Sequence, residues 1–98
     1  MELQFASNQL KRCFESSSVA TRIWGKQVGR KYIQCIGLLY SITSVADLYK
    51  FRSLRPHALS NNRSQQISVV LSAQWRLIIT QLDDSTLRVE EVTNHYDD

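Results

Sequence analysis

Apolar residues recur at helical spacing near the start of the chain. Leu10, Cys13 and Phe14 lie three or four positions apart, which places them on one side of a helix. Ser7 precedes them, and its hydroxyl can accept a hydrogen bond from an amide of the first turn. The serines at 16–18 compete for backbone hydrogen bonds and should end the helix. The pattern therefore predicts one short amphipathic helix beginning after Ser7.

A second, longer helix is predicted over residues 27–42, after a short turn near 19–24. Its apolar residues recur every three or four positions, and Lys31 belongs to a polar and cationic stripe on the opposite side. Gly29 and Gly37 each cost about 1 kcal/mol relative to alanine within a helix, which predicts that both mark close contacts. The pattern indicates an amphipathic helix that lies on an apolar surface.

The second half of the chain changes to the alternating pattern of β-strands. Ile67, Val69 and Leu71 occupy every second position, the period expected of a strand. Further strands are predicted at 75–80 and 87–92, together with a candidate first strand at 3–6. Pro56 cannot donate to a sheet ladder, so the segment around it is at best an edge strand.

Helices followed by strands with short connections predict an α+β fold. Two N-terminal helices should pack on one face of a small twisted antiparallel sheet, since short turns join antiparallel neighbours. A chain of 98 residues, 43% of them hydrophobic, suffices for one core. We therefore predict a single domain over residues 1–98.

Composition narrows the location of the protein. No run of about 18 apolar residues is present, and the first residues lack the order of a signal peptide, so we expect no membrane contact and a cytoplasmic protein. The two cysteines, Cys13 and Cys35, lack CxxC spacing and fall among apolar helical positions. We predict buried reduced thiols, with a disulfide or a metal pair as the alternative.

Charge is distributed unevenly along the chain. Ten Lys or Arg and two acidic residues lie between Lys11 and Arg63, whereas two Arg and six acidic residues lie between Ser64 and Asp98. A basic first stretch and an acidic second stretch suit a protein that meets a polyanion on one side. The alternative is a basic surface that serves solubility alone.

Arg76 lies inside an otherwise apolar strand, and a cation there needs a reason. One interpretation is a functional site, and the other is an ion pair with Glu90 or Glu91 across the sheet. The chain has two histidines, His57 just before the predicted sheet and His95 just after it. Histidine is suited to proton transfer near neutral pH, and arginine is a fixed bidentate phosphate clamp.

Four motifs in order along the chain carry a resemblance to one family. LKRCFES (10–16) is similar to LKKFFETG of that family, and LRPHALSNNR (54–63) is similar to FRLHPLKGDR. ISVVLSAQWRL (67–77) is similar to WSIRVNGNWRI, and TNHY (93–96) follows the last strand where the family has Asp-Tyr-His. The chain thus resembles, over nearly its whole length, the HigB-type toxins of bacterial toxin–antitoxin systems, in the RelE superfamily.

This resemblance implies a fold, an activity and partners. The fold is a small twisted sheet with two helices on one face, and the toxin cleaves mRNA in the ribosomal A site without a metal or organic cofactor. The implied partner is a HigA-like antitoxin with a helix-turn-helix domain, and the complex reaches operator DNA only through that antitoxin.

RNA cleavage without a metal needs a base, an acid and a cation that stabilises the phosphorane charge. The resemblance places His57, Arg76 and His95 at family positions, and Tyr96 is a candidate proton donor or stacking ring. Surface roles for His57 and His95, and a frayed end at Tyr96, are the alternatives. The candidate RNA-binding cations are Arg52, Arg55, Arg63 and Lys31.

Two positions depart from the family pattern. Ser60 stands where the family has a lysine, and Val70 stands where it has an arginine. By strand parity Val70 shares a face with Arg76, so that face has lost a cation. A weaker nuclease is one consequence, and the second hypothesis is a catalytically weak or inactive module with this fold that binds an antitoxin partner or RNA.

Overall fold

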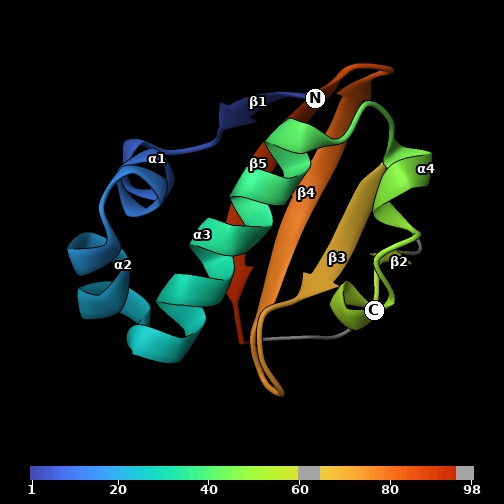
Figure 1. Cartoon of the computed structure of the whole chain (residues 1–98). Coiled ribbons are helices and arrows are strands. Elements are labelled where there is room, and N and C mark those ends of the chain that lie inside the picture. Colours follow the sequence, from blue (N-terminus) through green and yellow to red (C-terminus); the bar gives the residue numbers. More distant parts are fainter. Residues whose placement is uncertain (60–64, 95–98) are drawn as a thin grey trace.

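The computed structural model describes residues 1–59 and 65–94 of the chain (Figure 1). In these ranges the helices are α1 (Asn8–Glu15), α2 (Ser17–Trp24), α3 (Lys26–Ser41) and α4 (Val45–Leu48), with the 3-10 turn η1 (Arg52–Leu54). The strands are β1 (Glu2–Phe5), β2 (His57–Ala58), β3 (Gln66–Val70), β4 (Arg76–Asp83) and β5 (Thr86–Thr93). The α+β class predicted from the sequence is confirmed.

The strands form one mixed sheet in the order β1-β5-β4-β3-β2. Strands β2 to β5 pair antiparallel, as predicted, and the segment after Pro56 is an edge strand. The expectation of a purely antiparallel sheet is wrong at β1, which runs parallel to β5. A parallel pair cannot be joined by a short turn, and here the helices and strands β2 to β4 all lie between β1 and β5 in the sequence.

The helices begin and end at serines. The Ser7 hydroxyl accepts from the amide of Leu10 at 3.2 Å and caps α1. Ser16 is both the C-cap of α1 and the N-cap of α2. The first helix therefore ends where predicted, and a second helix begins at the same residue. Residues 19–24, expected to hold only a short turn, belong to the complete helix α2, so four helices lie between β1 and β2 where two were predicted.

The two glycines of α3 differ in their surroundings. A Cβ at Gly29 would lie 3.1 Å from the carbonyl carbon of Ala20, so α2 and α3 approach closely there. A Cβ at Gly37 would meet nothing within 4 Å. The prediction of a close contact is therefore confirmed for Gly29 and wrong for Gly37.

The core lies between α3 and the sheet. Figure 1 shows α3 crossing one face of the sheet, with α1 and α2 beside it. Alternate residues of β3 and β4, among them Val69, Leu77 and Ile79, are buried in one cluster with Ile36 and Leu39 of α3. The face of the sheet that carries Val69, Leu77 and Ile79 is therefore the one that α3 covers. The residues that alternate with them point to the opposite face.

The thiols of Cys13 and Cys35 are free and buried, as predicted. Burial raises the pKa of the Cys35 thiol to about 12 and raises that of Cys13 from 9.0. Tyr32, also buried, donates its hydroxyl to the carbonyl oxygen of Leu10 at 2.7 Å and joins α3 to α1. No helix in the described part of the chain combines the length and apolar character needed to cross a membrane.

Candidate nucleic-acid interface

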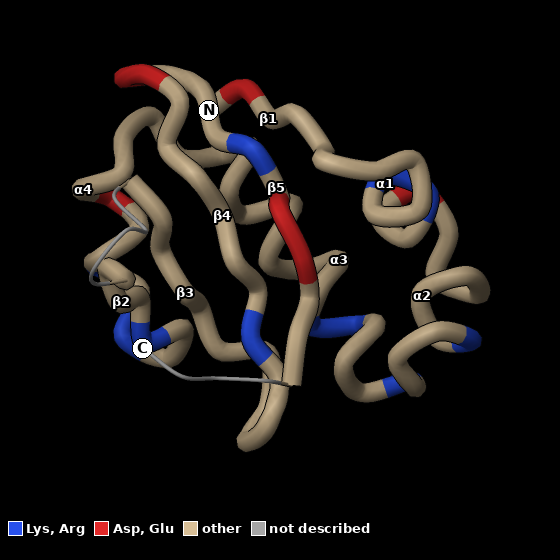
Figure 2. Tube along the Cα trace, turned by 180° about the vertical axis from the view of Figure 1, so that it is seen from behind, with Lys and Arg blue, Asp and Glu red and all other residues tan. Residues whose placement is uncertain are grey.

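The face of the sheet opposite α3 carries His57 and Arg76. Arg76 pairs with Val70 across β3 and β4, and His57 pairs with Ser68, two residues from Val70 on the same strand. Side chains two apart on a strand point to the same face, so His57 and Arg76 share one face. Figure 2 views the molecule from that side, where the basic positions of β4 and the β2 region are marked in blue.

The two residues are separated by two strand spacings across the sheet and two residues along it. That displacement corresponds to about 12 Å between the Cα atoms of His57 and Arg76. His57 is exposed on the outermost strand, and Arg76 is half-buried on a central strand. One face therefore carries an imidazole and a guanidinium within reach of a single bound chain, while their backbones remain well apart.

The Arg76 guanidinium is anchored at the turn between β3 and β4. Its Nη1 donates to the carbonyl oxygens of Ser72 at 3.0 Å, Ala73 at 3.4 Å and Trp75 at 3.2 Å. These bonds direct the cation toward the turn, away from the row that contains His57. They also rigidify it, because a guanidinium holds its donors in a fixed plane.

The predicted alternative for Arg76 was an ion pair with Glu90 or Glu91. Glu90 accepts from Arg88 Nε at 2.8 Å and from the hydroxyl of Thr80. The side-chain amide of Gln66 donates to the same Thr80 hydroxyl at 3.3 Å. The carboxylate of Glu90 is thus engaged in a polar ladder at the opposite end of the sheet face, four residues along β4 from Arg76.

The middle of this face is less polar than an RNA site would suggest. Val70 lies directly across from Arg76, which confirms the predicted strand parity and places an aliphatic side chain where the family has a cation. Ile78 and Ser68 are only 4% and 1% exposed although they point away from α3. The cationic character of the face therefore comes from its margins.

The basic segment before β2 lies at one margin. Arg52 and Arg55 are exposed at η1 and its C-cap, beside the edge of the sheet. Arg55 adopts a left-handed backbone conformation with φ 45°, uncommon for a residue with a side chain. The other site candidates, Arg63, His95 and Tyr96, lie outside the described residues, as does Ser60.

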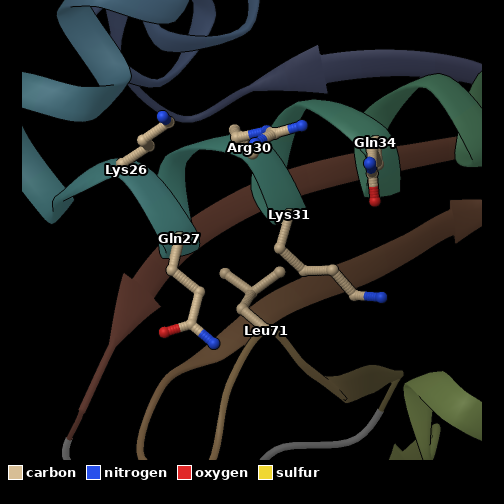
Figure 3. A pocket seen from close by; sticks show the side chains of 6 residues that line it. All are labelled: Lys26, Gln27, Arg30, Lys31, Gln34 and Leu71. Atoms are coloured by element: carbon tan, nitrogen blue, oxygen red, sulfur yellow. The ribbon is translucent and has the colours of Figure 1, made fainter.

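Lys31 lies elsewhere. It is on α3, on the helical side of the sheet, where it lines a groove of about 560 Å³ with Lys26, Gln27, Arg30, Gln34 and Leu71 (Figure 3). The structure therefore does not bring Lys31 together with His57 and Arg76. The helical period of α3 indicates its basic stripe but not the groove, because Leu71, which closes the groove, is distant in sequence.

Within residues 1–59 and 65–94, no group of three or more His, Cys, Asp or Glu side chains is placed to hold a metal ion. The described residues of the sheet face and its margin offer an imidazole, a guanidinium and neighbouring cations. This set can transfer a proton and stabilise a phosphate charge.

The backbone of the chain is similar to the crystal structure of YafQ from E. coli strain BL21(DE3). The TM-score is 0.65 and the sequence identity 20%, with 93% of this chain and 89% of that chain covered. No family model and no curated protein matches the sequence. A likeness at this identity establishes the fold, and the predicted RelE-like α+β fold is confirmed.

Proposed function

We propose that this chain is the toxin of a type II toxin–antitoxin system and acts as a metal-independent endoribonuclease on mRNA at the ribosome. The observation that carries the proposal is the strand register that puts His57 and Arg76 on one face. The RelE-like fold that this chain shares with YafQ supports it. The HigB subtype, a HigA-like helix-turn-helix antitoxin, operator DNA reached through that antitoxin and a cytoplasmic location belong to the same proposal.

The reaction uses the ribose itself as nucleophile. The 2′-oxygen attacks the adjacent phosphorus, the bond to the 5′-oxygen breaks, and a 2′,3′-cyclic phosphate and a 5′-hydroxyl result. One proton leaves the 2′-hydroxyl and one reaches the 5′-oxygen. We assign His57 to the first transfer and His95 or Tyr96 to the second, with Arg76 stabilising the charge on the phosphate oxygens.

Induced expression in bacteria tests the proposal. We expect growth arrest with the native chain and rescue by Arg76→Lys or His57→Ala. Arg88→Ala is the matched control, because Arg88 lies on the same sheet face but bonds to Glu90 at the far end. Growth arrest that survives both site substitutions, or that Arg88→Ala relieves equally, contradicts the assignment.

Cleavage on purified ribosomes with a bound message separates catalysis from other causes of toxicity. Loss of one donor that stabilises a transition state typically lowers kcat by about 10²–10³. We expect a fall of that size in Arg76→Lys, while the thermal unfolding temperature, measured on the same preparations, controls for loss of the turn contacts.

A second candidate function is a non-catalytic module with this fold that binds an antitoxin or RNA. The observation that favours it is Val70, which occupies the position opposite Arg76 where a second cation would face the phosphate. Val70→Arg distinguishes the two. A nuclease gains activity from the restored cation, whereas a binding module remains inactive on ribosomes with either residue.

A further inference from the structure

The groove on the helical side of the molecule is lined by three cations of α3. Lys26 and Arg30 are one turn apart on α3, about 6 Å along its axis, and Lys31 lies beside Arg30. Leu71, the residue directly after β3, forms the opposite wall (Figure 3). In Figure 3 the Lys31 side chain extends past Leu71.

The groove continues in both directions. Lys26 and Gln27 also line a pocket of about 470 Å³ shared with Trp24 and Trp75, and Lys31 also lines one of about 120 Å³ shared with Phe51. Aromatic side chains thus stand at both ends of the cationic stretch. This combination of a basic groove and stacking rings is the usual design of a surface for single-stranded nucleic acid.

No acidic side chain of the described residues lines any of these three pockets. Within the same residues, no ion pair engages Lys26, Arg30 or Lys31; the ion pairs seen there join Lys50 to Asp47 and Arg88 to Glu90. Cations on a helix face usually serve solubility, but these gather around a groove with no counter-charge. The arrangement is complementary to a polyanion.

The turn between β3 and β4 links this groove to the other side of the sheet. Ala73 and Gln74 line the pocket that holds Trp24 and Trp75, and they also line a pocket of about 320 Å³ with Arg76 and Asn94. A bound strand can therefore pass around the tip of this turn from one pocket to the next.

We propose that the groove of Lys26, Arg30 and Lys31 binds the backbone of a single-stranded RNA segment, which passes the turn at Ala73 and Gln74 to reach Arg76. This inference rests on the proposed function for the choice of RNA as the polyanion and for the cleavage site near Arg76. The cations contact phosphates, and Trp24 and Trp75, which line the adjoining pocket, stack on bases. The groove thereby holds the substrate on the face away from the bond that is cut.

A 2′-O-methyl oligouridine of about twelve nucleotides tests the groove without any cleavage, because it has no free 2′-hydroxyl. Its dissociation constant is measured by fluorescence anisotropy between about 50 and 200 mM salt, the range in which phosphate contacts dominate. The test variant replaces Lys26, Arg30 and Lys31 with Gln. The matched control replaces Lys11, Arg12 and Lys50 with Gln. These three residues are exposed on other surfaces, so the control removes the same charge.

Each phosphate contact contributes about 0.7 to the logarithmic salt slope on a single strand. We therefore expect the slope of the groove variant to fall by about 2 and its affinity at 0.1 M salt to weaken about a hundredfold, with little change in the control. Circular dichroism verifies that the variants are folded, and Lys31→Gln alone, with an expected slope change of about 0.7, gives the same test with minimal perturbation.

The chain has two tryptophans, and both line the end of the groove, so their emission reports on it. In a Trp75→Phe protein the oligonucleotide should quench Trp24, and the groove substitutions should abolish the quenching at the same oligonucleotide concentration. Equal slopes in the groove variant and the control, or binding of acidic peptides but not RNA, overturn the inference. Failure of the proposed nuclease would appear separately, as no cleavage on ribosomes or as cleavage that His57 and Arg76 substitutions do not change.

Discussion

Gly29→Ala and Gly37→Ala, the same substitution at two places in α3, should change stability in opposite directions. In a helix, alanine is favoured over glycine by about 1 kcal/mol. Gly37 is exposed, and an added Cβ there has nothing within 4 Å. Gly37→Ala should therefore raise the free energy of unfolding by this full amount. For a domain of this size, about 1 kcal/mol raises the unfolding temperature by about 4–8 °C.

At Gly29 the same gain is opposed by a collision. The added Cβ would lie 3.1 Å from the carbonyl carbon of Ala20 and 3.1 Å from the amide nitrogen of Thr21. The preferred separation between carbon atoms is about 3.5–4.0 Å, and these neighbours are backbone atoms that cannot rotate away. Overpacking of this kind costs about 1–3 kcal/mol, so a net loss of about 1 kcal/mol remains.

Urea denaturation followed by circular dichroism measures the free energy of unfolding of both variants. Equal m values, the slopes of this free energy against urea concentration, would show that the unfolded states are comparable. Stabilisation of both by the same amount would refute the reasoning, since α2 and α3 would then not be in close contact at Gly29. The result bears on the groove as well, because this contact sets the position of the segment that joins α2 to α3.

Three further predictions follow from individual side chains. Tyr32→Phe removes the buried hydrogen bond to α1 and should lower the free energy of unfolding by about 1 kcal/mol, whereas Tyr40→Phe, at an exposed ring, should leave it unchanged in the same denaturation assay. Arg76→Ala removes the bonds to the turn carbonyls and should cost about 1–2 kcal/mol; hydrogen exchange of the turn amides would report the loosening, and unchanged exchange would contradict it. Burial raises the pKa of the Cys35 thiol to about 12, so above pH 9.0 the unfolded chain loses this proton first; the free energy of unfolding should fall between pH 9.0 and about 12, and less steeply in Cys35→Ala.

Local chemistry made the ends of the helices and the antiparallel strands predictable. Ser7 caps α1 because its hydroxyl serves the nearest amides, and the alternation around Val69 reflects a side that must be buried. What the sequence did not reveal depends on distant partners. The helix at 17–24 owes its place to packing against Gly29, and the parallel pairing of β1 depends on a strand at the far end of the chain.

The site was predictable in part for the same reason. Strand parity placed Val70 beside Arg76, because alternation along a strand is a local property. The three carbonyl oxygens around the Arg76 guanidinium and the groove between α3 and Leu71 were not predictable. Both depend on how a turn folds back and how a helix lies over the end of a strand, which periodicity does not encode.

The pairing of β1 with β5 has a consequence for synthesis. Glu2 is opposite Thr86, so β1 waits for a partner that is made more than eighty residues later. At about 5–20 residues per second, that wait lasts roughly 4–17 s. During translation the β1 segment is therefore open to chaperones and proteases, and β1 can pair with β5 only after residues 86–89 have been made.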